Sequence, residues 1–229
     1  MRSIARLFKG MLTKIGALLP LWFIHWLNAT VNYLYAGHWL SQKGFSLQDG
    51  RVKDRIEVFR KIAEEFEGQR VLYLEFGVHR GDSMRIWGSL LRHPESQLHG
   101  FDSFQGLPER WLMTKDAGEF NTNGVIPEIN DPRVKFHPGW FEDTLRDFIP
   151  ETLDRMLLNI DADLYSSTRT VLDRLGPAIE LRDIIYFDEF TTREHELRAW
   201  EEFLTKTTME FEIFTADVTL SNIAFRRVR

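Results

Sequence analysis

The chain has 229 residues, of which 43% are hydrophobic and 28% are charged, a composition that supports a substantial core and argues against a disordered protein. The formal net charge is −5 and no segment interleaves basic with aromatic residues in the manner of an RNA-binding sheet, which argues against nucleic acid as a partner. Cysteine is absent, so disulfides, a thiolate nucleophile and cysteine-ligated zinc are excluded.

The first forty residues differ from the rest in composition. Apolar residues recur there at helical spacing: Ile4, Leu7, Phe8, Met11, Leu12, Ile15 and Leu18. Basic residues occupy the other face of the same predicted helix: Arg2, Arg6, Lys9 and Lys14. This pattern is typical of a basic amphipathic helix. Pro20 and Asn28 interrupt the next apolar run, which therefore falls short of the ~20 apolar residues of a transmembrane helix, and no small-x-small cleavage site supports a signal peptide.

Two interpretations of this N-terminal segment stay open. In the first, residues 1–40 lie in a membrane interface, with Trp22, Trp26 and Trp39 as anchors. In the second, the helices pack on the following domain or on a partner subunit, which is the more common fate of an amphipathic helix. A polar stretch, SQKGFSLQDGR, then predicts a boundary between a helical extension, residues 1–45, and a folded domain, residues 46–229.

Strands and helices alternate along that domain. The predicted strands cover residues 71–76, 98–101, 134–137, 155–160, 184–187, 211–216 and 220–227. The predicted helices cover residues 52–69, 83–92, 168–179 and 195–205. This order indicates an α/β fold with a mostly parallel sheet, in which one of the last two strands is antiparallel. The long polar loop 106–132 is typical of a functional lid.

The first predicted strand ends in the motif LEFGVHRGDS. Its pattern places Glu75 at the strand end, Gly77 and Gly81 in the turn, and Asp82 or Ser83 as the cap of the next helix. Glycines suit a backbone that turns sharply beside a ligand, although a purely structural turn would use them as well. The third glycine of a pyrophosphate-binding G-x-G-x-x-G is missing, and an acid here favours a cationic or hydroxyl-bearing ligand.

Two further strand ends carry residues suited to a nucleoside. Asp102 closes the second strand, where nucleotide-binding folds place the acid that binds ribose hydroxyls, although an ordinary turn aspartate is equally compatible. After the strand 134–137, Gly139 precedes Trp140. An aromatic residue at this position can stack on adenine or belong to the core.

Acids also end two neighbouring strands of the predicted sheet. Asp161 and Asp163 follow the strand 155–160, and Asp188 and Glu189 follow the strand 184–187. If these strands are adjacent, Asp161, Asp188 and Glu189 converge and repel one another unless they share a cation. Oxygen ligands favour Mg²⁺, Ca²⁺ or Mn²⁺, and the alternative is a set of solvated carboxylates. We expect Asp163 to cap or brace the turn into the following helix.

Five phrases between residues 71 and 190 carry a family resemblance: LEFGVHRGDS, GFDSFQGLPE, GWFEDTL, IDADLYSST and YFDEF. In this order they resemble the class I S-adenosylmethionine-dependent methyltransferases, and more closely the metal-dependent macrolide-sugar O-methyltransferases typified by macrocin O-methyltransferase. The resemblance implies a Rossmann-like, seven-stranded, mostly parallel sheet with helices on both faces. That family usually carries two aspartates where this chain has Asp188 and Glu189.

The resemblance also implies roles for individual residues. The cofactor contacts would be Glu75, Gly77, Gly81, Asp102, Ser103, Gly139, Trp140 and Asp161. The ligands of Mg²⁺ or Mn²⁺ would be Asp161, Asp188 and Glu189. Asp161 would also act as the catalytic base. The segment TTREHELRAWEEF is only loosely similar to the family. In this segment His195, a candidate catalytic residue, and Arg198 would face the acceptor if their helix begins beside the site, and a surface role is the alternative for each.

We therefore expect an S-adenosylmethionine-dependent, divalent-metal-assisted O-methyltransferase that acts on a vicinal diol of a sugar or glycosylated metabolite. One alternative is an NAD- or nucleotide-sugar-binding Rossmann enzyme, and another is a membrane-associated, non-catalytic binding module. The expected partner is a small-molecule hydroxyl acceptor, while homo-oligomerisation is left open. The expected location is the cytoplasm or the inner face of a membrane.

Overall fold

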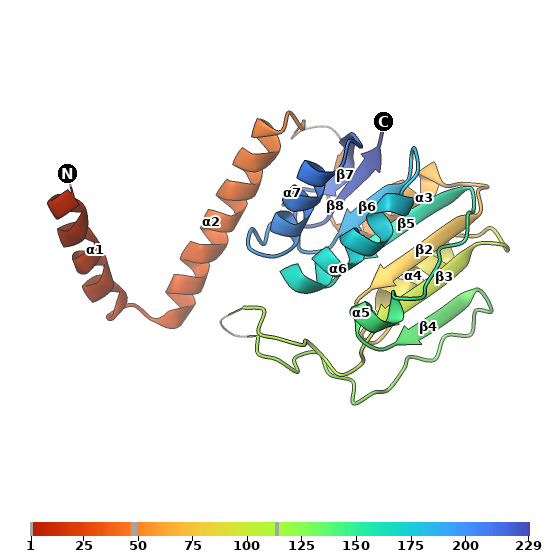
Figure 1. Cartoon of the computed structure of the whole chain (residues 1–229), viewed down its shortest axis with the longest axis horizontal. Helices are drawn as coiled ribbons and strands as arrows, with labels where there is room; N and C mark the ends of the chain where they lie inside the picture. Colours follow the sequence, from red (N-terminus) through yellow and green to blue (C-terminus); the bar gives the residue numbers. More distant parts are fainter. Residues whose placement is uncertain (1, 47–49, 113–114) are drawn as a thin grey trace.

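The computed structural model describes residues 2–46, 50–112 and 115–229. In these residues eight strands form one sheet in the order β1-β7-β8-β6-β5-β2-β3-β4 (Figure 1). The strands are β1 (Arg51–Val52), β2 (Val71–Phe76), β3 (Gln97–Asp102), β4 (Val134–Pro138), β5 (Arg155–Ile160), β6 (Ile184–Phe187), β7 (Phe211–Asp217) and β8 (Ile223–Arg227). All neighbours are parallel except those of β8, which is antiparallel to β6 and β7. The mostly parallel sheet is confirmed.

The eighth strand was not expected from the sequence. Arg51 and Val52 pair with Ala216 and Asp217 at the edge of the sheet, although the predicted helix included residue 52. The helix α3 (Arg55–Glu65) begins later because Asp54 is its N-cap, where the side chain accepts a hydrogen bond from the Glu57 amide. Such a cap satisfies a backbone donor that has no partner within the helix.

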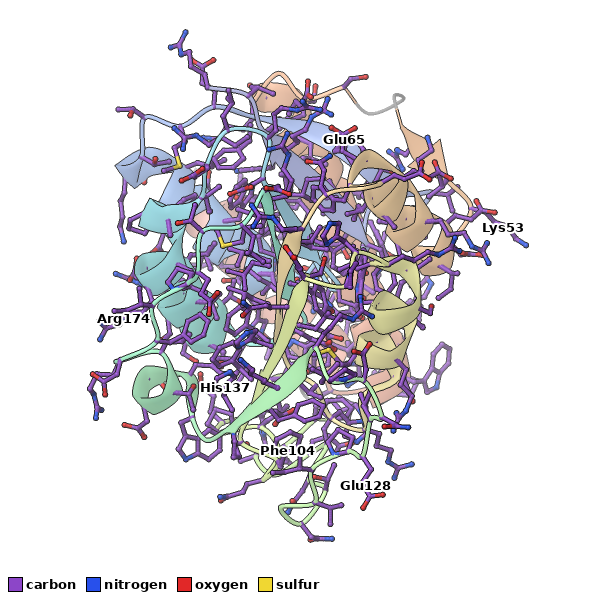
Figure 2. The ribbon with its side chains drawn as sticks, turned by 90° about the vertical axis from the view of Figure 1, so that its right-hand side faces the viewer. Lys53, Glu65, Phe104, Glu128, His137 and Arg174 are labelled. Carbon is purple, nitrogen blue, oxygen red and sulfur yellow. The ribbon has the colours of Figure 1, made fainter. Side chains whose placement is uncertain are left out.

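Helices cover both faces of the sheet, as predicted. They are α3, α4 (Asp82–Leu90), α5 (Phe141–Thr144), α6 (Tyr165–Leu175), the 3-10 turn η1 (Gly176–Ala178) and α7 (Glu196–Lys206). Figure 2 shows the sheet between the layer that includes Glu65 and the layer that includes Arg174. Side chains of β2 alternate between the two layers: Tyr73 packs with α3 and α4, whereas Leu74 packs with α6 and α7. The strand is therefore buried on both sides, which is why it reads as a continuous apolar run.

Two predicted helix caps were wrong. The N-cap of α4 is Gly81 rather than Asp82 or Ser83, and its φ of 79° lies in the left-handed region that favours glycine. The N-cap of α6 is Leu164, without a side-chain hydrogen bond. Asp163, expected to cap this helix or to brace the turn before it, is not the cap; its φ is 60° and it lines a cavity.

The N-terminal extension forms two helices, α1 (Arg2–Gly16) and α2 (Leu21–Gln42). The C-terminal end of α2 packs on the domain, where Ala36, Trp39 and Leu40 join the core and Trp39 Nε1 donates to Glu201 Oε1 at 2.8 Å. Trp39 is therefore not an exposed anchor, because only 5% of it is accessible. Figure 1 shows α1 and the beginning of α2 projecting away from the domain. None of the helices in the described part of the chain has the length and apolarity to cross a membrane.

Candidate active site

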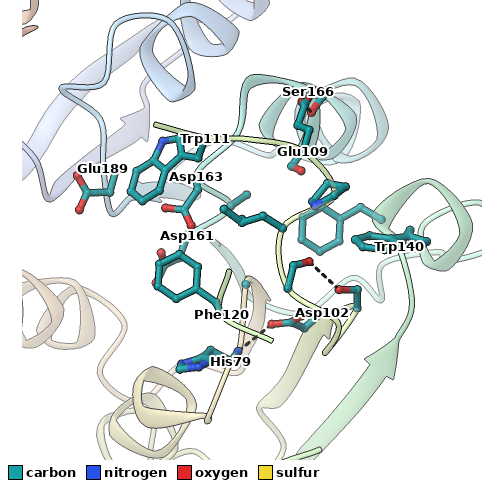
Figure 3. A pocket seen from close by; sticks show the side chains of 18 of the residues that line it. His79, Asp102, Glu109, Trp111, Phe120, Trp140, Asp161, Asp163, Ser166 and Glu189 are labelled. Carbon is teal, nitrogen blue, oxygen red and sulfur yellow. Dashed lines mark hydrogen bonds between the residues drawn. The ribbon is translucent and has the colours of Figure 1, made fainter. Parts of the chain in front are cut away.

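A cavity of about 730 Å³ opens at the carboxyl edge of the parallel strands (Figure 3). The ends of five neighbouring strands contribute to its wall: Gly77 after β2, Asp102 at the end of β3, Gly139 after β4, Asp161 after β5 and Asp188 after β6. Parallel strands bring their carboxyl ends to one edge, where open α/β sheets bind ligands. The sheet therefore assembles residues from the four separate motifs that the sequence suggested.

Gly77 lets the turn after β2 approach the end of β5. Its φ is 98°, and a Cβ atom at this position would lie 1.9 Å from the backbone oxygen of Asp161. Only glycine tolerates both this conformation and this contact. Gly81 has a different role, because it caps α4 and a Cβ there would meet Pro127 at 3.1 Å. Gly81 is not among the residues that line the cavity in the described part of the chain.

Glu75 lies beneath the cavity rather than in its wall. Its side chain is 1% exposed, and it accepts a hydrogen bond of 2.9 Å from the Tyr73 hydroxyl. Tyr73 in turn accepts a hydrogen bond from Asn159 Nδ2 at 2.7 Å. Burial raises the pKa of Glu75 to about 8, because desolvation disfavours the charged carboxylate.

Asp102 is held rigidly in the cavity wall. Its Oδ2 atom accepts hydrogen bonds from the amides of Val78 (2.9 Å) and His79 (2.8 Å), and its Oδ1 atom accepts one from the Phe104 amide (2.7 Å). The Ser103 hydroxyl beside it donates to the Gly106 carbonyl. Carboxylate oxygens have further lone pairs, so Asp102 can still accept hydrogen bonds from a ligand hydroxyl.

An exposed indole forms another part of the wall. Trp140 is 37% exposed and lines the cavity beside Gly139. Gly139 has a φ of 144°, and a Cβ atom there would lie 2.9 Å from Thr144 Cγ2. The core aromatic of this turn is instead Phe141, which packs edge-on against Phe76. The indole of Trp140 is thereby left available for a planar ligand.

Four carboxylates line the opposite part of the cavity: Asp161, Asp163, Asp188 and Glu189. The strands β5 and β6 are neighbours, as the convergence of these acids requires. Burial, together with the nearby Asp188, raises the pKa of Asp161 well above its usual range. Burial also raises the pKa of Asp163 and of Glu189 to about 7, with Glu189 and Asp188 respectively as the next largest causes. Burial therefore increases the proton affinity of Asp161, Asp163 and Glu189.

A fifth acid that the sequence reasoning missed lies behind this cluster. Glu196 is completely buried, and its Oε2 atom accepts a hydrogen bond from the Glu189 amide at 3.1 Å. Its Oε1 atom is buried without a hydrogen-bond partner among the described residues. Burial and then Asp161 raise the pKa of Glu196. In the sequence, Glu196 lies at the start of a predicted helix, and this position does not predict that its side chain is buried.

Arg55 places a positive charge beside the acids. The sequence did not predict this position. Its Nη1 atom lies 3.1 Å from Asp188 Oδ2, its Nη2 atom donates to the Ser83 hydroxyl, and its guanidinium group stacks over the Phe59 ring. Arg55 and Asp188 are 133 positions apart in the sequence. No local pattern could have indicated this pair, because the contact depends on how α3 packs on the sheet.

His195 and Arg198 are not brought to the cavity. His195 is the N-cap of α7, and its Nδ1 atom accepts a hydrogen bond from the Tyr165 amide at 3.3 Å. Burial lowers the pKa of His195. The Arg198 guanidinium stacks over the Tyr165 ring at 4.2 Å and pairs with Glu202. Both residues therefore connect α6 with α7, and neither is among the described lining residues.

The predicted lid covers the cavity in part. Its residues in the wall are Gly106, Leu107, Pro108, Glu109, Trp111 and Phe120. The Ser166 hydroxyl of α6 donates to Glu109 Oε1 at 2.6 Å, which ties the lid to the domain. Residues 113 and 114 of the predicted lid lie outside the described residues.

Residues 49–227 match the family model described as macrocin O-methyltransferase (TylF). The chain belongs to this family. The match begins close to the predicted boundary near residue 45, although the division into extension and domain stays a prediction. Membership of the macrocin O-methyltransferase family makes the protein an O-methyltransferase, so neither the NAD-dependent alternative nor the non-catalytic module is needed.

Individual relatives agree with this assignment. Demethyldecarbamoylnovobiocin O-methyltransferase of Streptomyces niveus is 27% identical over 185 residues, which are 71% of this chain and 70% of that protein. The 8-demethyl-8-(2,3-dimethoxy-alpha-L-rhamnosyl)-tetracenomycin-C 4'-O-methyltransferase of Streptomyces olivaceus is 28% identical over 137 residues, 51% of this chain and 52% of that protein.

Solved structures share the fold. The O-methyltransferase NovP superposes with a TM-score of 0.56 at 24% identity, over 76% of this chain and 80% of that one. The calicheamicin methyltransferase CalS11 superposes with a TM-score of 0.58 at 20% identity, over 75% of this chain and 76% of that one. The Rossmann-like architecture predicted from the sequence is confirmed.

The carboxylate side chains in the cavity of this macrocin O-methyltransferase family member are of the chemical type that binds a divalent cation. Asp161, Asp188 and Glu189 offer only oxygen, the ligand that Mg²⁺ and Mn²⁺ prefer, and a cation would relieve the repulsion among them. In the described residues, however, no three acidic or histidine side chains already stand in a ligating arrangement. Asp188 is instead engaged by Arg55 through Oδ2 and by the Tyr186 hydroxyl through Oδ1.

Proposed function

We propose that this protein transfers a methyl group from S-adenosylmethionine to one hydroxyl of a vicinal diol on a sugar or glycosylated small molecule. The observation that carries the proposal is the single cavity that contains both the anchored Asp102 and the buried Asp161. The two curated relatives are named as O-methyltransferases of demethyldecarbamoylnovobiocin and of a rhamnosyl-tetracenomycin. The rhamnosyl group in the second name supports a glycosylated acceptor.

The cofactor would occupy the part of the cavity between the turn after β2 and the start of α5. Asp102 would accept hydrogen bonds from the ribose hydroxyls, because its oxygens line the cavity and the backbone of two loops holds them in place. Trp140 would stack on the adenine ring. Gly77 would let the methionine portion lie against the backbone. Glu75 and Gly81 support this turn from outside the cavity wall.

Asp161 would accept the proton from the acceptor hydroxyl. As the hydroxyl oxygen forms its bond to the methyl carbon, the bond from that carbon to sulfur breaks and S-adenosylhomocysteine leaves. Such an in-line displacement depends on alignment of the reacting atoms. A carboxylate whose pKa is raised by burial is a better proton acceptor than an exposed one. Asp161 meets this requirement and borders the cavity.

Asp161, Asp188 and Glu189 would together hold Mg²⁺ or Mn²⁺. A bound divalent cation lowers the pKa of a coordinated hydroxyl and orients a chelating diol. Addition of Mg²⁺ is expected to raise the melting temperature of the wild-type protein, and calorimetry should detect its binding. Asp188→Asn should abolish both effects, whereas Asp82→Asn, at an exposed position on α4, should abolish neither. An unchanged melting temperature with no heat of binding would contradict the metal proposal alone.

The methyl-transfer proposal is tested with S-adenosylmethionine and a panel of sugars and glycosides that carry vicinal or isolated hydroxyls. Mass spectrometry should detect a methylated product only from vicinal diols. Asp161→Asn should lower kcat by about 10²- to 10⁴-fold while the Kd for S-adenosylhomocysteine stays unchanged. Asp163→Asn, in the same cavity, should lower kcat much less. Full activity of Asp161→Asn would exclude Asp161 as the base.

A further inference from the structure

A large apolar surface on the N-terminal helices has no partner in the described structure. One face of α1 carries six apolar side chains between 43% and 74% exposed: Ile4, Leu7, Phe8, Met11, Leu12 and Ile15. On α2, the side chains of Trp22 and Trp26 are also exposed, at 70% and 58%. Soluble monomers rarely expose a contiguous apolar surface of this kind, and such surfaces mark interaction sites.

The charge of this segment identifies the partner that suits it. Residues 1–48 contain five basic residues and no acid, so the remainder of the chain carries ten more acids than bases. At 100° per residue, Arg6 and Lys9 lie opposite the apolar face of α1, and Lys14 lies at its border. Helices that lie in the surface of an anionic bilayer have one apolar face, basic residues outside that face and tryptophans close by, and α1 with the start of α2 has all three features. Pairing of two copies through this face would leave Arg6 and Lys9 on the outside of the pair, so it would not account for the basic residues of α1.

The helices also have a defined position relative to the cavity. The Tyr33 hydroxyl of α2 lies 3.4 Å from Ser221 Oγ, and the adjacent Asn222 donates to the Asp188 carbonyl at 2.7 Å. Tyr33 is therefore at the carboxyl edge of the sheet. Farther along the chain, Phe45 packs on Phe225, which lies nearer the middle of β8. Thus α2 passes the edge at Tyr33, and the residues before it project beyond the edge where the cavity opens (Figure 1).

We propose that α1 and the first three turns of α2 dock this protein on an anionic lipid surface and hold the cavity edge of the sheet toward that surface. The apolar side chains of α1 would enter the boundary between headgroups and acyl chains, while the aliphatic stems of Arg6, Lys9 and Lys14 would let their charges reach the headgroups. The attachment is peripheral, and it does not depend on the chemistry that the cavity performs.

Flotation of the full chain with vesicles tests this docking. Binding is expected to vesicles of phosphatidylcholine mixed with phosphatidylglycerol and to be much weaker with phosphatidylcholine alone. High salt should weaken the binding, because it screens charges at the surface. The triple variant Arg6→Glu, Lys9→Glu, Lys14→Glu should lose about 100-fold or more in partition, since each basic residue near an anionic surface contributes about fivefold.

A matched variant separates local charge from net charge. Lys53→Glu, Arg60→Glu and Lys61→Glu change the net charge equally at exposed positions on or next to α3, and the partition should stay within about twofold of the wild type. Trp22→Ala with Trp26→Ala should weaken binding at all salt concentrations. Calorimetry with S-adenosylhomocysteine checks that each variant keeps its folded domain.

Two outcomes would overturn the docking proposal. The first is equal partition of the wild type and the triple variant, or no partition of either. The second is a stable dimer by light scattering that Leu7→Glu with Met11→Glu dissociates, together with no binding to anionic vesicles. That result would assign the apolar face to contact between two copies of the chain.

Discussion

At the scale of single residues, Gly77 controls how closely two loops meet at the cavity. Gly77→Ala would place a Cβ atom 1.9 Å from the Asp161 carbonyl and force a left-handed conformation on alanine. We expect a loss of about 2–4 kcal/mol of unfolding free energy, combining this displacement with strain of about 1–3 kcal/mol, and a much weaker affinity for S-adenosylhomocysteine. Urea unfolding and calorimetry measure these effects.

Gly118→Ala is the control for this substitution. Gly118 has a similar φ of 83°, but a Cβ atom there meets nothing within 4 Å. Its replacement should cost only the strain of the positive φ, and the cofactor affinity should not change. If both substitutions had the same cost, the contact with Asp161 would not explain why position 77 requires glycine.

Glu75 leads to a prediction about pH. Burial raises its pKa from the reference value of 4.5 to about 8, so the folded state binds the proton more tightly than the unfolded state. The contribution of Glu75 to the unfolding free energy is then greatest below the pKa of the unfolded state and falls as pH rises from about 4.5 to 8. Each unit of pKa difference corresponds to about 1.4 kcal/mol.

Glu75→Gln should flatten the fall in unfolding free energy between pH 5 and pH 8, because glutamine cannot ionise and still accepts the Tyr73 hydrogen bond. Glu65→Gln is the control. Although Glu65 is partly buried, its contacts with Arg182 and Arg226 hold its pKa below the usual range, so its replacement should leave the slope above pH 5 unchanged. Denaturant titrations across this pH range measure the slopes. A Glu75→Gln slope equal to that of the wild type would argue against a protonated Glu75.

At the scale of elements, α2 belongs to the folded domain at its C-terminal end. Trp39→Ala removes a buried indole and its hydrogen bond to Glu201, and we expect it to cost about 3–5 kcal/mol of unfolding free energy. Trp22→Ala, at the exposed end of the same helix, should change stability by less than about 0.5 kcal/mol in the absence of lipid. Equal effects in thermal or urea unfolding would contradict the packing of α2.

Element boundaries were predicted most accurately where burial is continuous. The strands β2, β5 and β6 match their predicted residues, since each is a buried apolar run that ends where a turn begins. The sequence did not predict boundaries that depend on contacts with another element or on the conformation of a turn. Residues 51 and 52 became a strand because β7 offered them an edge to pair with, and the N-cap of α4 moved to Gly81 because that turn needs a left-handed residue.

At the scale of the whole molecule, cofactor binding should stabilise the fold. S-Adenosylhomocysteine at 100 times its Kd is expected to add about 2.7 kcal/mol to the unfolding free energy, and NAD at the same concentration should add nothing. Asp102→Asn should reduce the gain, because amide nitrogen cannot accept the hydrogen bonds of the ribose or of the loop amides. Thermal unfolding with each ligand makes the comparison, and stabilisation by NAD alone would contradict the cofactor assignment.

The sequence by itself determined the alternation of strands and helices, the acids and glycines at the strand ends, and the family to which the chain belongs. These features are local, because hydrophobic periodicity and strand-end motifs are written in consecutive residues. Only the tertiary structure decided that Arg55 faces Asp188, that Glu196 is buried behind the acids and that His195 lies outside the cavity. Each of these depends on side-chain direction and on contacts between elements far apart in the chain, which no local pattern encodes.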